Sequence, residues 1–315
     1  MNTTGLTFGP IPSRRLGQSL GINNTLLPKA CSFNCAYCQA GRSHHLEIER
    51  RAFFSPQEIY KAVSNAVQNA EKEGIEIDYL SFVPDGEPSL DIRLGESITL
   101  LKSLGKRIAV FTNASLIWRP DVRADLGLAD WVSLKFDAVL EPAWRRIDRP
   151  QKYLSLPLIM DGARAFARQF KGSLVTETML CAGLNDMPDN LSATADFIAQ
   201  LSPSVAYIGA PTRPPLEKWV LPPDEAILTQ AFAIFAARIP KVELMVGYPP
   251  PAYQPGDDAE RDLPAILAVH PIREAEMQDY LNKGGYSDEV LKRLIQKGII
   301  KKTTYAGEEF WLRVM

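Results

Sequence analysis

Two hydrophobic periods alternate along most of the chain. Short apolar runs rich in β-branched residues are followed by longer stretches in which apolar positions recur every three or four residues. The first pattern is typical of strands buried on both faces, and the second of amphipathic helices. It predicts strands at 18–22, 77–83, 107–113, 131–138, 173–180 and 204–210, with one more short strand at 241–247. It predicts helices at 55–74, 94–105, 120–126, 151–171, 188–201 and 223–238.

This strand–helix repetition indicates an α/β protein with a parallel sheet covered by helices. The start of the helix predicted at 55–74 is marked clearly in the sequence. Its signals are an N-cap at Ser55, a first-position proline at Pro56 and a capping box completed by Glu58. Ligands of such sheets bind at the carboxyl ends of the strands. The polar residues that follow each predicted strand are therefore candidates for a site.

The pattern changes after residue 247. Residues 248–258 are rich in proline and acidic, which predicts a linker. Beyond them, two short amphipathic helices precede a hairpin that turns at Ala306–Gly307. This order resembles a small winged-helix-like module, so we expect a core at 1–247, a linker at 248–258 and the module at 259–315.

The second helix of this module carries basic and polar residues whose role the sequence leaves open. A nucleic-acid contact is one interpretation, and a solvated face is the simpler one, because nearby acidic residues nearly cancel the charge. A module of this shape also suits peptide recognition or a lid over the core. The residues are Lys292, Arg293, Gln296 and Lys297.

Composition and charge limit the partners and the cellular compartment that we expect for this protein. The formal net charge is −2, which gives no reason to expect a global polyanion-binding surface. No apolar run is long enough to span a bilayer, and the N-terminus lacks a signal-peptide pattern. We therefore expect a cytoplasmic protein without a membrane partner, in which thiols stay reduced.

Three of the four cysteines stand close together. Cys31, Cys35 and Cys38 form a C-x3-C-x2-C array. Structural zinc takes four ligands, whereas three thiolates can hold three irons of a [4Fe–4S] cluster and leave the fourth iron open. The alternatives are a disulfide, or a metal site completed by His44 or His45.

The array, with Tyr37 before its last cysteine, resembles the signature of the radical S-adenosylmethionine (SAM) superfamily. The segment Asp85-Gly86-Glu87-Pro88 is similar to that family's GGEP motif, with Asp85 in place of the first glycine. The resemblance implies a [4Fe–4S] cluster and SAM as cofactors, Tyr37 near the adenine, and this segment on the methionyl ammonium. It also implies a partial (β/α)6 TIM-like barrel, for which a full eight-fold barrel is the alternative. The segment alone is also compatible with a turn that caps a helix.

Other candidates follow from strand alternation. Ser133, Lys135 and Asp137 share one face of a strand, and we expect that face to point into the barrel together with Glu177 of the next strand. Lys135 and Glu177 are candidate catalytic residues, although a purely structural ion pair between them remains an alternative. Cys181 is a candidate hydrogen-atom donor or a small buried apolar residue. Candidates for the ribose or carboxylate of SAM are Thr112, Asn113, Ser115 and Ser133; candidates for substrate contact are Asn185, Tyr207 and Arg213.

The segments GPIPSRRLGQSLGINN, GLND and APTRPP resemble a stand-alone group related to the wyosine-forming tRNA enzymes. Those enzymes need a second cluster, as do methylthiotransferases and auxiliary-cluster peptide maturases, and one remaining cysteine cannot hold it. The expectation is a single-cluster enzyme that cleaves SAM to a 5′-deoxyadenosyl radical and abstracts hydrogen from a nucleoside or tRNA, a peptide or a small molecule. A flavodoxin- or ferredoxin-type protein would donate the electron. The alternative is a non-enzymatic thiolate metal-binding or winged-helix regulatory protein.

Overall fold

The computed structural model describes residues 5–25, 29–215, 217–246, 255, 258–269, 271–305 and 307–314. Its centre is an eight-stranded sheet in which the strands follow one another in chain order. The first pair, β1 and β2, is antiparallel, and every later pair is parallel. The strands are β1 (Thr7–Ser13), β2 (Gly17–Ile22), β3 (Tyr79–Phe82), β4 (Arg107–Thr112), β5 (Trp131–Lys135), β6 (Ser173–Met179), β7 (Val205–Gly209) and β8 (Val242–Met245).

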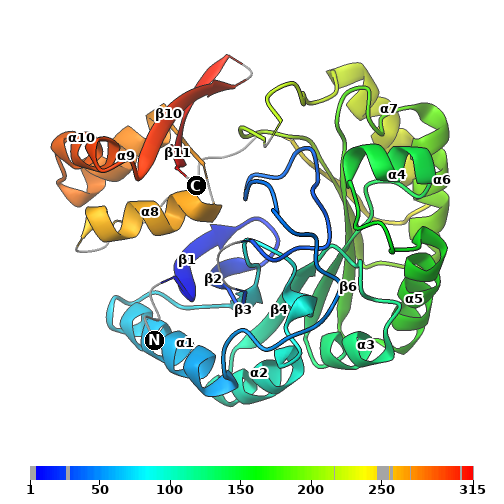
Figure 1. Ribbon diagram of the computed structural model, residues 1–315, viewed down its shortest axis with the longest axis horizontal. Coiled ribbons are helices and arrows are strands. Elements are labelled where there is room, and N and C mark those ends of the chain that lie inside the picture. Colours follow the sequence, from blue (N-terminus) through cyan, green and yellow to red (C-terminus); the bar gives the residue numbers. More distant parts are fainter. Residues whose placement is uncertain are drawn as a thin grey trace.

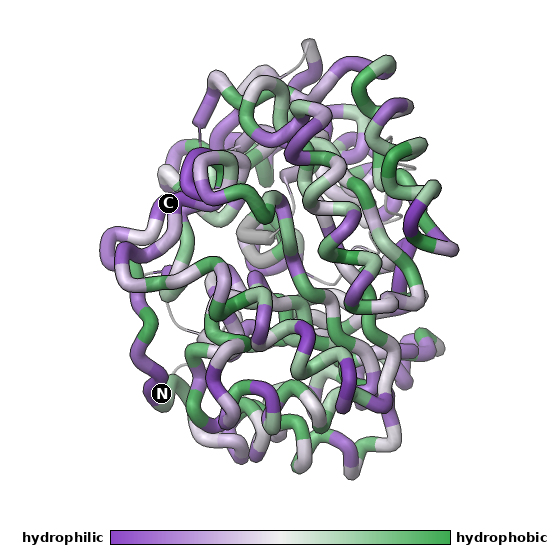
Figure 2. Tube along the Cα trace, turned by 90° about the vertical axis from the view of Figure 1, so that its right-hand side faces the viewer, coloured by the Kyte–Doolittle hydropathy of each residue, from purple (hydrophilic) through white to green (hydrophobic). Residues whose placement is uncertain are grey.

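Helices cover the outer side of this curved sheet (Figure 1). They are α1 (Pro56–Lys72), α2 (Leu94–Leu101), α3 (Pro120–Leu126), α4 (Glu141–Ile147), α5 (Leu156–Gln169), α6 (Pro188–Gln200) and α7 (Glu225–Ala236), with short 3-10 turns at Pro88–Leu90 and Lys102–Leu104. The helix tubes change between purple and green along their length, as amphipathic helices do (Figure 2). Because strands and helices alternate around an open sheet, the fold is a partial TIM-like barrel.

The predicted elements of the barrel are confirmed, and their boundaries shift by a few residues. The capping box at Ser55 forms: Ser55 Oγ accepts from the Glu58 amide at 3.2 Å, and Glu58 Oε2 accepts from the Ser55 amide at 2.8 Å. Val132 and Leu134 are fully buried in the main hydrophobic core, as the alternation in β5 predicts. The helix expected from residue 151 begins at Leu156.

Two barrel elements were not predicted. β1 contains Pro10 and Pro12, which normally argue against a strand; the sheet tolerates them because β1 is an edge strand. The short helix α4 begins with Glu141 and Pro142 and buries Trp144 and Ile147. With Ala143, its three buried residues span fewer than two helical turns, which is too short to produce a clear helical period in the sequence.

The last residues form a second group of elements. α8 (Ala259–Val269), α9 (Glu274–Gly284) and α10 (Glu289–Gln296) accompany a sheet of β9 (Ile272–Arg273), β10 (Ile300–Tyr305) and β11 (Glu308–Arg313) in the order β10-β11-β9. They share a hydrophobic cluster of their own. We call residues 258–314 the C-terminal module. Its winged-helix assignment and the domain boundaries stay predictions, and most of the expected linker, as well as Ala306 of the hairpin turn, lies outside the described residues.

The sequence pattern missed α8, because Pro264 interrupts its helical period. Its start is fixed by Asp258, whose Oδ1 accepts from the Glu260 amide at 3.0 Å. No helix in the described ranges is both long and apolar enough to cross a membrane.

Candidate functional site

The cysteine loop follows β2 at the carboxyl edge of the sheet. Its backbone is tied to a segment far along the chain: the Ala36 amide donates to the Ile147 carbonyl at 2.8 Å, the Asn34 amide to Asp148 at 3.1 Å, and the Gln151 amide donates back to Ser32 at 2.9 Å. Ser32 and Ala36 are buried completely. The loop is therefore held firmly against the end of α4.

Each thiol of the array meets a different polar partner. Asn113 Nδ2 lies 3.5 Å from Cys31 Sγ, Cys35 Sγ donates to Asp148 Oδ1 at 3.4 Å, and Lys29 Nζ donates to Cys38 Sγ at 2.9 Å. All four cysteines are free thiols, which removes the disulfide alternative. Among the described side chains, no three His, Cys, Asp or Glu groups are oriented to hold a metal ion.

Burial dominates the protonation of these thiols. It raises the pKa of Cys31 to about 11, against the opposing charge of Lys29. It also raises the pKa of Cys35 well above its ordinary value, with the neighbouring Asp148 adding to the effect. Binding a cluster to these residues would displace their protons, as metal binding to thiols generally does. Lys29 is the cation that lies close enough to influence all three sulfurs.

The Asp85–Pro88 segment packs directly on the cysteine loop. The Glu87 amide donates to the Ala30 carbonyl at 2.9 Å. A Cβ on Gly86 would stand 1.9 Å from that same carbonyl oxygen, so no side chain fits there. The glycine is thus required by the close approach of two backbones beside Cys31.

The Glu87 carboxylate is buried and accepts several internal hydrogen bonds. Its Oε1 accepts from Ser89 Oγ and Thr112 Oγ1, each at 2.6 Å, and its Oε2 accepts from the Asn113 amide at 2.7 Å. Burial raises its pKa, while these donors oppose the shift. Glu87 therefore joins the ends of β3 and β4, and it positions Asn113 beside Cys31.

Asp85 has an unused acceptor. Its Oδ2 accepts from Asn23 Nδ2 at 3.2 Å, whereas its buried Oδ1 has no hydrogen-bond partner. Burial raises its pKa, and the charges of Arg313 and Lys29 act in the opposite direction. An acidic oxygen that is buried without a partner, beside the cysteine loop, suits a cationic ligand group.

A second network joins the cysteine loop to β5. The Tyr37 hydroxyl donates to Asp137 Oδ2, and Lys135 Nζ stands 4.5 Å from the centre of the Tyr37 ring. Asp137 Oδ1 accepts from the Met179 amide at 2.7 Å. Burial raises the pKa of Tyr37 well above its ordinary value, and the Asp137 charge raises it further. Tyr37 is thus held as a neutral phenol between the loop and the barrel.

Glu177 makes its ion pair with Arg15 rather than with Lys135. Arg15 lies on the turn between β1 and β2, with its guanidinium 5.0 Å from the centre of the Phe111 ring. Ser133 Oγ donates to Glu177 Oε1 at 2.8 Å. Burial favours a raised pKa for Glu177, but the Arg15 and Lys135 charges outweigh it, so its pKa is lowered.

The remaining candidates have local partners. Ser115 Oγ lies 2.5 Å from Ser32 Oγ, which connects β4 to the cysteine loop. Cys181 is completely buried, and its amide donates to Asn185 Oδ1 at 2.9 Å. Tyr207 lies within the barrel wall, and Arg213 is buried in the loop after β7.

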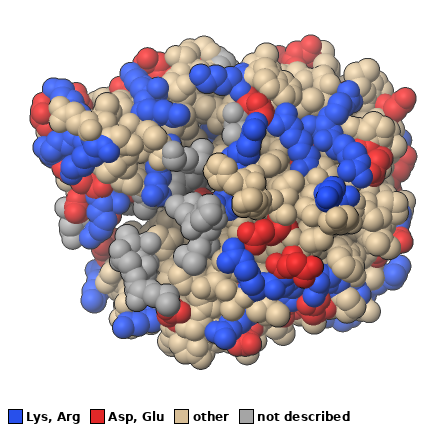
Figure 3. Space-filling model, in the orientation of Figure 1, with Lys and Arg blue, Asp and Glu red and all other residues tan. Residues whose placement is uncertain are grey.

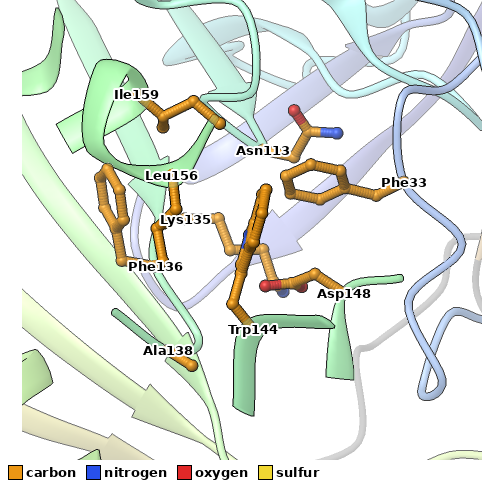
Figure 4. A pocket seen from close by; sticks show the side chains of 9 residues that line it. All are labelled: Phe33, Asn113, Lys135, Phe136, Ala138, Trp144, Asp148, Leu156 and Ile159. Atoms are coloured by element: carbon orange, nitrogen blue, oxygen red, sulfur yellow. The ribbon is translucent and has the colours of Figure 1, made fainter. Parts of the chain in front are cut away.

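A small pocket lies between α4, α5 and the strand ends (Figure 4). Phe33 and Trp144 meet edge to face over it, with ring centres 5.9 Å apart. Polar groups enter it from Lys135, Asp148 and Asn113. Six of its nine lining residues are apolar, and its free space is about that of a single water molecule. Its other lining residues are Phe136, Ala138, Leu156 and Ile159.

Comparison with known proteins identifies the family. The model of the radical SAM superfamily matches residues 26–197. The chain belongs to the radical SAM superfamily. A UPF0026 protein of Methanocaldococcus jannaschii is 41% identical over 98% of this chain and 96% of its own length. A UPF0026 protein of Synechocystis is 34% identical over 69% of this chain and 80% of its own length.

Solved structures share the fold. TYW1 with a lysine–pyruvate adduct bound has a TM-score of 0.54 at 15% identity and covers 71% of this chain and 76% of its own. Streptococcus suis SuiB bound to SAM has a TM-score of 0.52 at 12% identity, covering 71% and 49%. Radical SAM proteins are enzymes that use a [4Fe–4S] cluster with SAM and need an electron donor. The soft thiolate donors of this loop, with a buried acceptor nearby at Asp85, fit that pair of cofactors.

The sequence alone did not single out three residues that the structure places in this candidate site. Lys29 lies outside the cysteine array, although a lysine two positions before the first cysteine is a visible clue. Asp148 follows a helix that was not predicted, so its place was hidden. Arg15 was one of two adjacent arginines with no feature to distinguish them, and only the structure shows that it enters the barrel.

Proposed function

We propose that Cys31, Cys35 and Cys38 hold a single [4Fe–4S] cluster with one iron left for SAM. The observation that carries this proposal is the position of the cysteine loop, which lies at the carboxyl edge of the barrel against Gly86 and Asn113. When bound, the cofactors supply one reaction: an electron from the cluster splits SAM into methionine and a 5′-deoxyadenosyl radical, which takes a hydrogen atom from a substrate C–H bond.

The chain's own residues would bind and orient the ligands. The unpartnered Asp85 Oδ1 is suited to the methionyl ammonium, with Gly86 allowing close approach and with Glu87 and Pro88 shaping the turn. Tyr37 is suited to the adenine. The ribose and carboxylate candidates are Thr112, Asn113, Ser115 and Ser133, of which Thr112 and Asn113 are already fixed by Glu87.

Lys135 is suited to donating hydrogen bonds to a substrate rather than to accepting a proton. Burial lowers its pKa, but Asp137 and Glu177 outweigh this, so the pKa is raised and the ammonium form persists. Glu177 would act mainly through Arg15 and Ser133. Cys181 keeps its hydrogen at ordinary pH because burial raises its pKa, which a hydrogen-atom donor requires.

The substrate would be a nucleoside or tRNA, a peptide or a small molecule, and a flavodoxin- or ferredoxin-type protein would supply the electron in the cytoplasm. The C-terminal module does little to favour an RNA substrate. Two of its cations, Arg293 and Lys297, are already paired with Glu260 of α8. If tRNA is the substrate, retention on immobilised tRNA should weaken steeply with salt.

Anaerobic reconstitution tests the function. The wild-type protein should take up iron and sulfide, absorb as a cubane cluster does, and release 5′-deoxyadenosine when reduced with SAM. Replacing Cys31, Cys35 or Cys38 by alanine should abolish both cluster loading and cleavage. The matched control is Cys181→Ala, which should load normally. Cleavage at the wild-type rate in an array variant would refute the assignment; iron uptake without any SAM cleavage would favour the non-enzymatic metal-binding alternative.

A further inference from the structure

A group of exposed cations and aromatic rings surrounds the cysteine loop. We call it the Trp219 surface, and it consists of Arg42, Arg149, Lys152, Tyr153, Lys218 and Trp219. Trp219 is 56% exposed and Tyr153 is 71% exposed. The Arg149 guanidinium lies 5.8 Å from the Trp219 ring centre, and Lys152 Nζ lies 4.8 Å from the Tyr153 ring centre. Large exposed aromatic side chains beside cations are typical of binding surfaces.

The segments of this surface are bonded to the backbone that carries the thiols. The Glu217 amide donates to the Ala36 carbonyl at 3.3 Å, and the Asn34 amide approaches the Arg149 carbonyl at 3.3 Å. Arg42 belongs to the cysteine loop itself. Cys35 and Cys38 are also partly exposed, unlike Cys31. The Trp219 surface therefore lies on the side where the cluster site comes closest to solvent.

The charge of the Trp219 surface is positive, although the whole chain carries a formal net charge of −2. Its central carboxylate, Glu217, is shared by Arg42 at 3.0 Å and Arg149 at 2.6 Å. Lys152 and Lys218 add exposed cations on either side. Lys and Arg side chains also gather on the upper right of the face seen in Figure 3. A local positive field speeds the encounter with an acidic partner.

We infer that the Trp219 surface docks an acidic one-electron-donor protein, a flavin or iron–sulfur carrier, against the cysteine loop. This inference rests on the proposed function. One electron leaves the reduced donor, which is oxidised by one unit, and enters the cluster, which is reduced by one unit; no bond is formed or broken in the step. Electron transfer falls steeply with distance, so the donor must approach the cluster closely, and this surface provides the approach.

An RNA partner fits the same surface less well. Arg42 and Arg149 converge on the Glu217 carboxylate rather than lining up along a stripe that could follow a phosphate backbone. A compact patch with a central tryptophan corresponds to a protein interface of small size, as transient redox encounters have.

The test compares two reductants on the reconstituted full-length protein. Reduced flavodoxin serves as the acidic protein donor, and reduced methyl viologen serves as a small donor that needs no docking surface. The variant is Lys152→Glu/Lys218→Glu, and the matched control is Lys61→Glu/Lys72→Glu on the exposed side of α1. Trp219→Ala probes the aromatic contact. Stopped-flow absorbance follows cluster reduction, and released 5′-deoxyadenosine follows cleavage.

The expected result is a fall of about 10- to 100-fold in the flavodoxin-driven rate for Lys152→Glu/Lys218→Glu, with a weaker salt dependence, and an unchanged viologen-driven rate. Trp219→Ala should lower the flavodoxin-driven rate as well. The inference fails if the surface variant matches the α1 control, or if it loses tRNA retention while flavodoxin reduces it normally. Absence of viologen-driven SAM cleavage in the wild-type protein would instead overturn the proposed function, and the inference with it.

Discussion

Lys29 is the single residue with the most direct influence on the array. Its side chain is 9% exposed. Its ammonium donates to Cys38 Sγ at 2.9 Å and to the Gly41 carbonyl at 2.8 Å. Burial lowers the pKa of Lys29, but the three thiols outweigh it and the pKa is raised, so the charge persists. A buried cation beside a ligand sulfur stabilises the more negative state of a bound cluster.

Lys29→Met should therefore make the reconstituted cluster harder to reduce. The methionine keeps an unbranched apolar side chain of similar reach and removes the charge. We expect the ratio of reduced to oxidised cluster at a fixed potential to fall about tenfold, equivalent to about 59 mV for one electron. A redox titration followed by electron paramagnetic resonance measures this shift. Lys29→Arg should restore much of it, and Lys61→Met should leave the midpoint unchanged; an unaltered midpoint in Lys29→Met would contradict the role.

Among the elements, the turn after β3 depends most on a single residue type. Gly86 lies where the turn and the cysteine loop approach within hydrogen-bonding distance, through the Glu87 amide and the Ala30 carbonyl at 2.9 Å. The neighbour of a new Cβ would be backbone rather than a flexible side chain. Neither segment can yield without moving Cys31.

Gly86→Ala should lower the free energy of unfolding by about 1–3 kcal/mol, because overpacking forces the backbone to shift. It should also reduce iron loading. Urea unfolding of the cluster-free protein and iron analysis after reconstitution measure the two effects. The control is Gly209→Ala, where the nearest atom to a new Cβ is a Met179 side-chain carbon at 3.7 Å. Equal stability and loading in both variants would show that the turn has more freedom than the structure indicates.

Elements with strong local patterns were predictable, and those whose pattern is broken were not. β3 to β7 have apolar runs that only a buried strand explains. β1 and α8 contain prolines that a lone sequence cannot distinguish from breaks, since only the edge position of β1 and the packing of α8 make them acceptable. The cysteine array was equally visible because its three thiols are close in sequence.

The partners within the site were not predictable. The register that places Lys135 opposite Glu177 was inferable from strand alternation, but the turn that brings Arg15 to Glu177 was not. Likewise, Asp148 reaches Cys35 across more than a hundred residues of chain. Such pairs depend on the path of loops, which no local periodicity encodes.

At the scale of the molecule, the C-terminal module connects two distant parts of the open barrel. Ile11 of β1 packs against the module's hydrophobic cluster. On the other side, the Tyr305 hydroxyl donates to the carbonyls of Pro211 at 3.3 Å and Val220 at 3.2 Å, in the loop after β7. Burial raises the pKa of Tyr305 to about 12, so it remains a donor at physiological pH.

Tyr305→Phe should loosen this connection by about 0.5–1.5 kcal/mol, the usual net value of a hydrogen bond. Hydrogen exchange should become faster in 211–221 and in 300–305, while the barrel core stays protected. Tyr153→Phe is the control, because that hydroxyl belongs to a residue that is 71% exposed. Unchanged exchange in Tyr305→Phe would mean that packing alone holds the module.

The long-range anchoring of the cysteine loop has a consequence for how the protein matures. The thiols emerge early in synthesis, yet the backbone groups that fix their loop belong to Ile147, Asp148 and Gln151, and then to Glu217. Since each strand pairs with the strand that precedes it in the chain, the sheet can form strand by strand during translation. The fully anchored cysteine loop is therefore expected to form only after about two thirds of the chain has been translated.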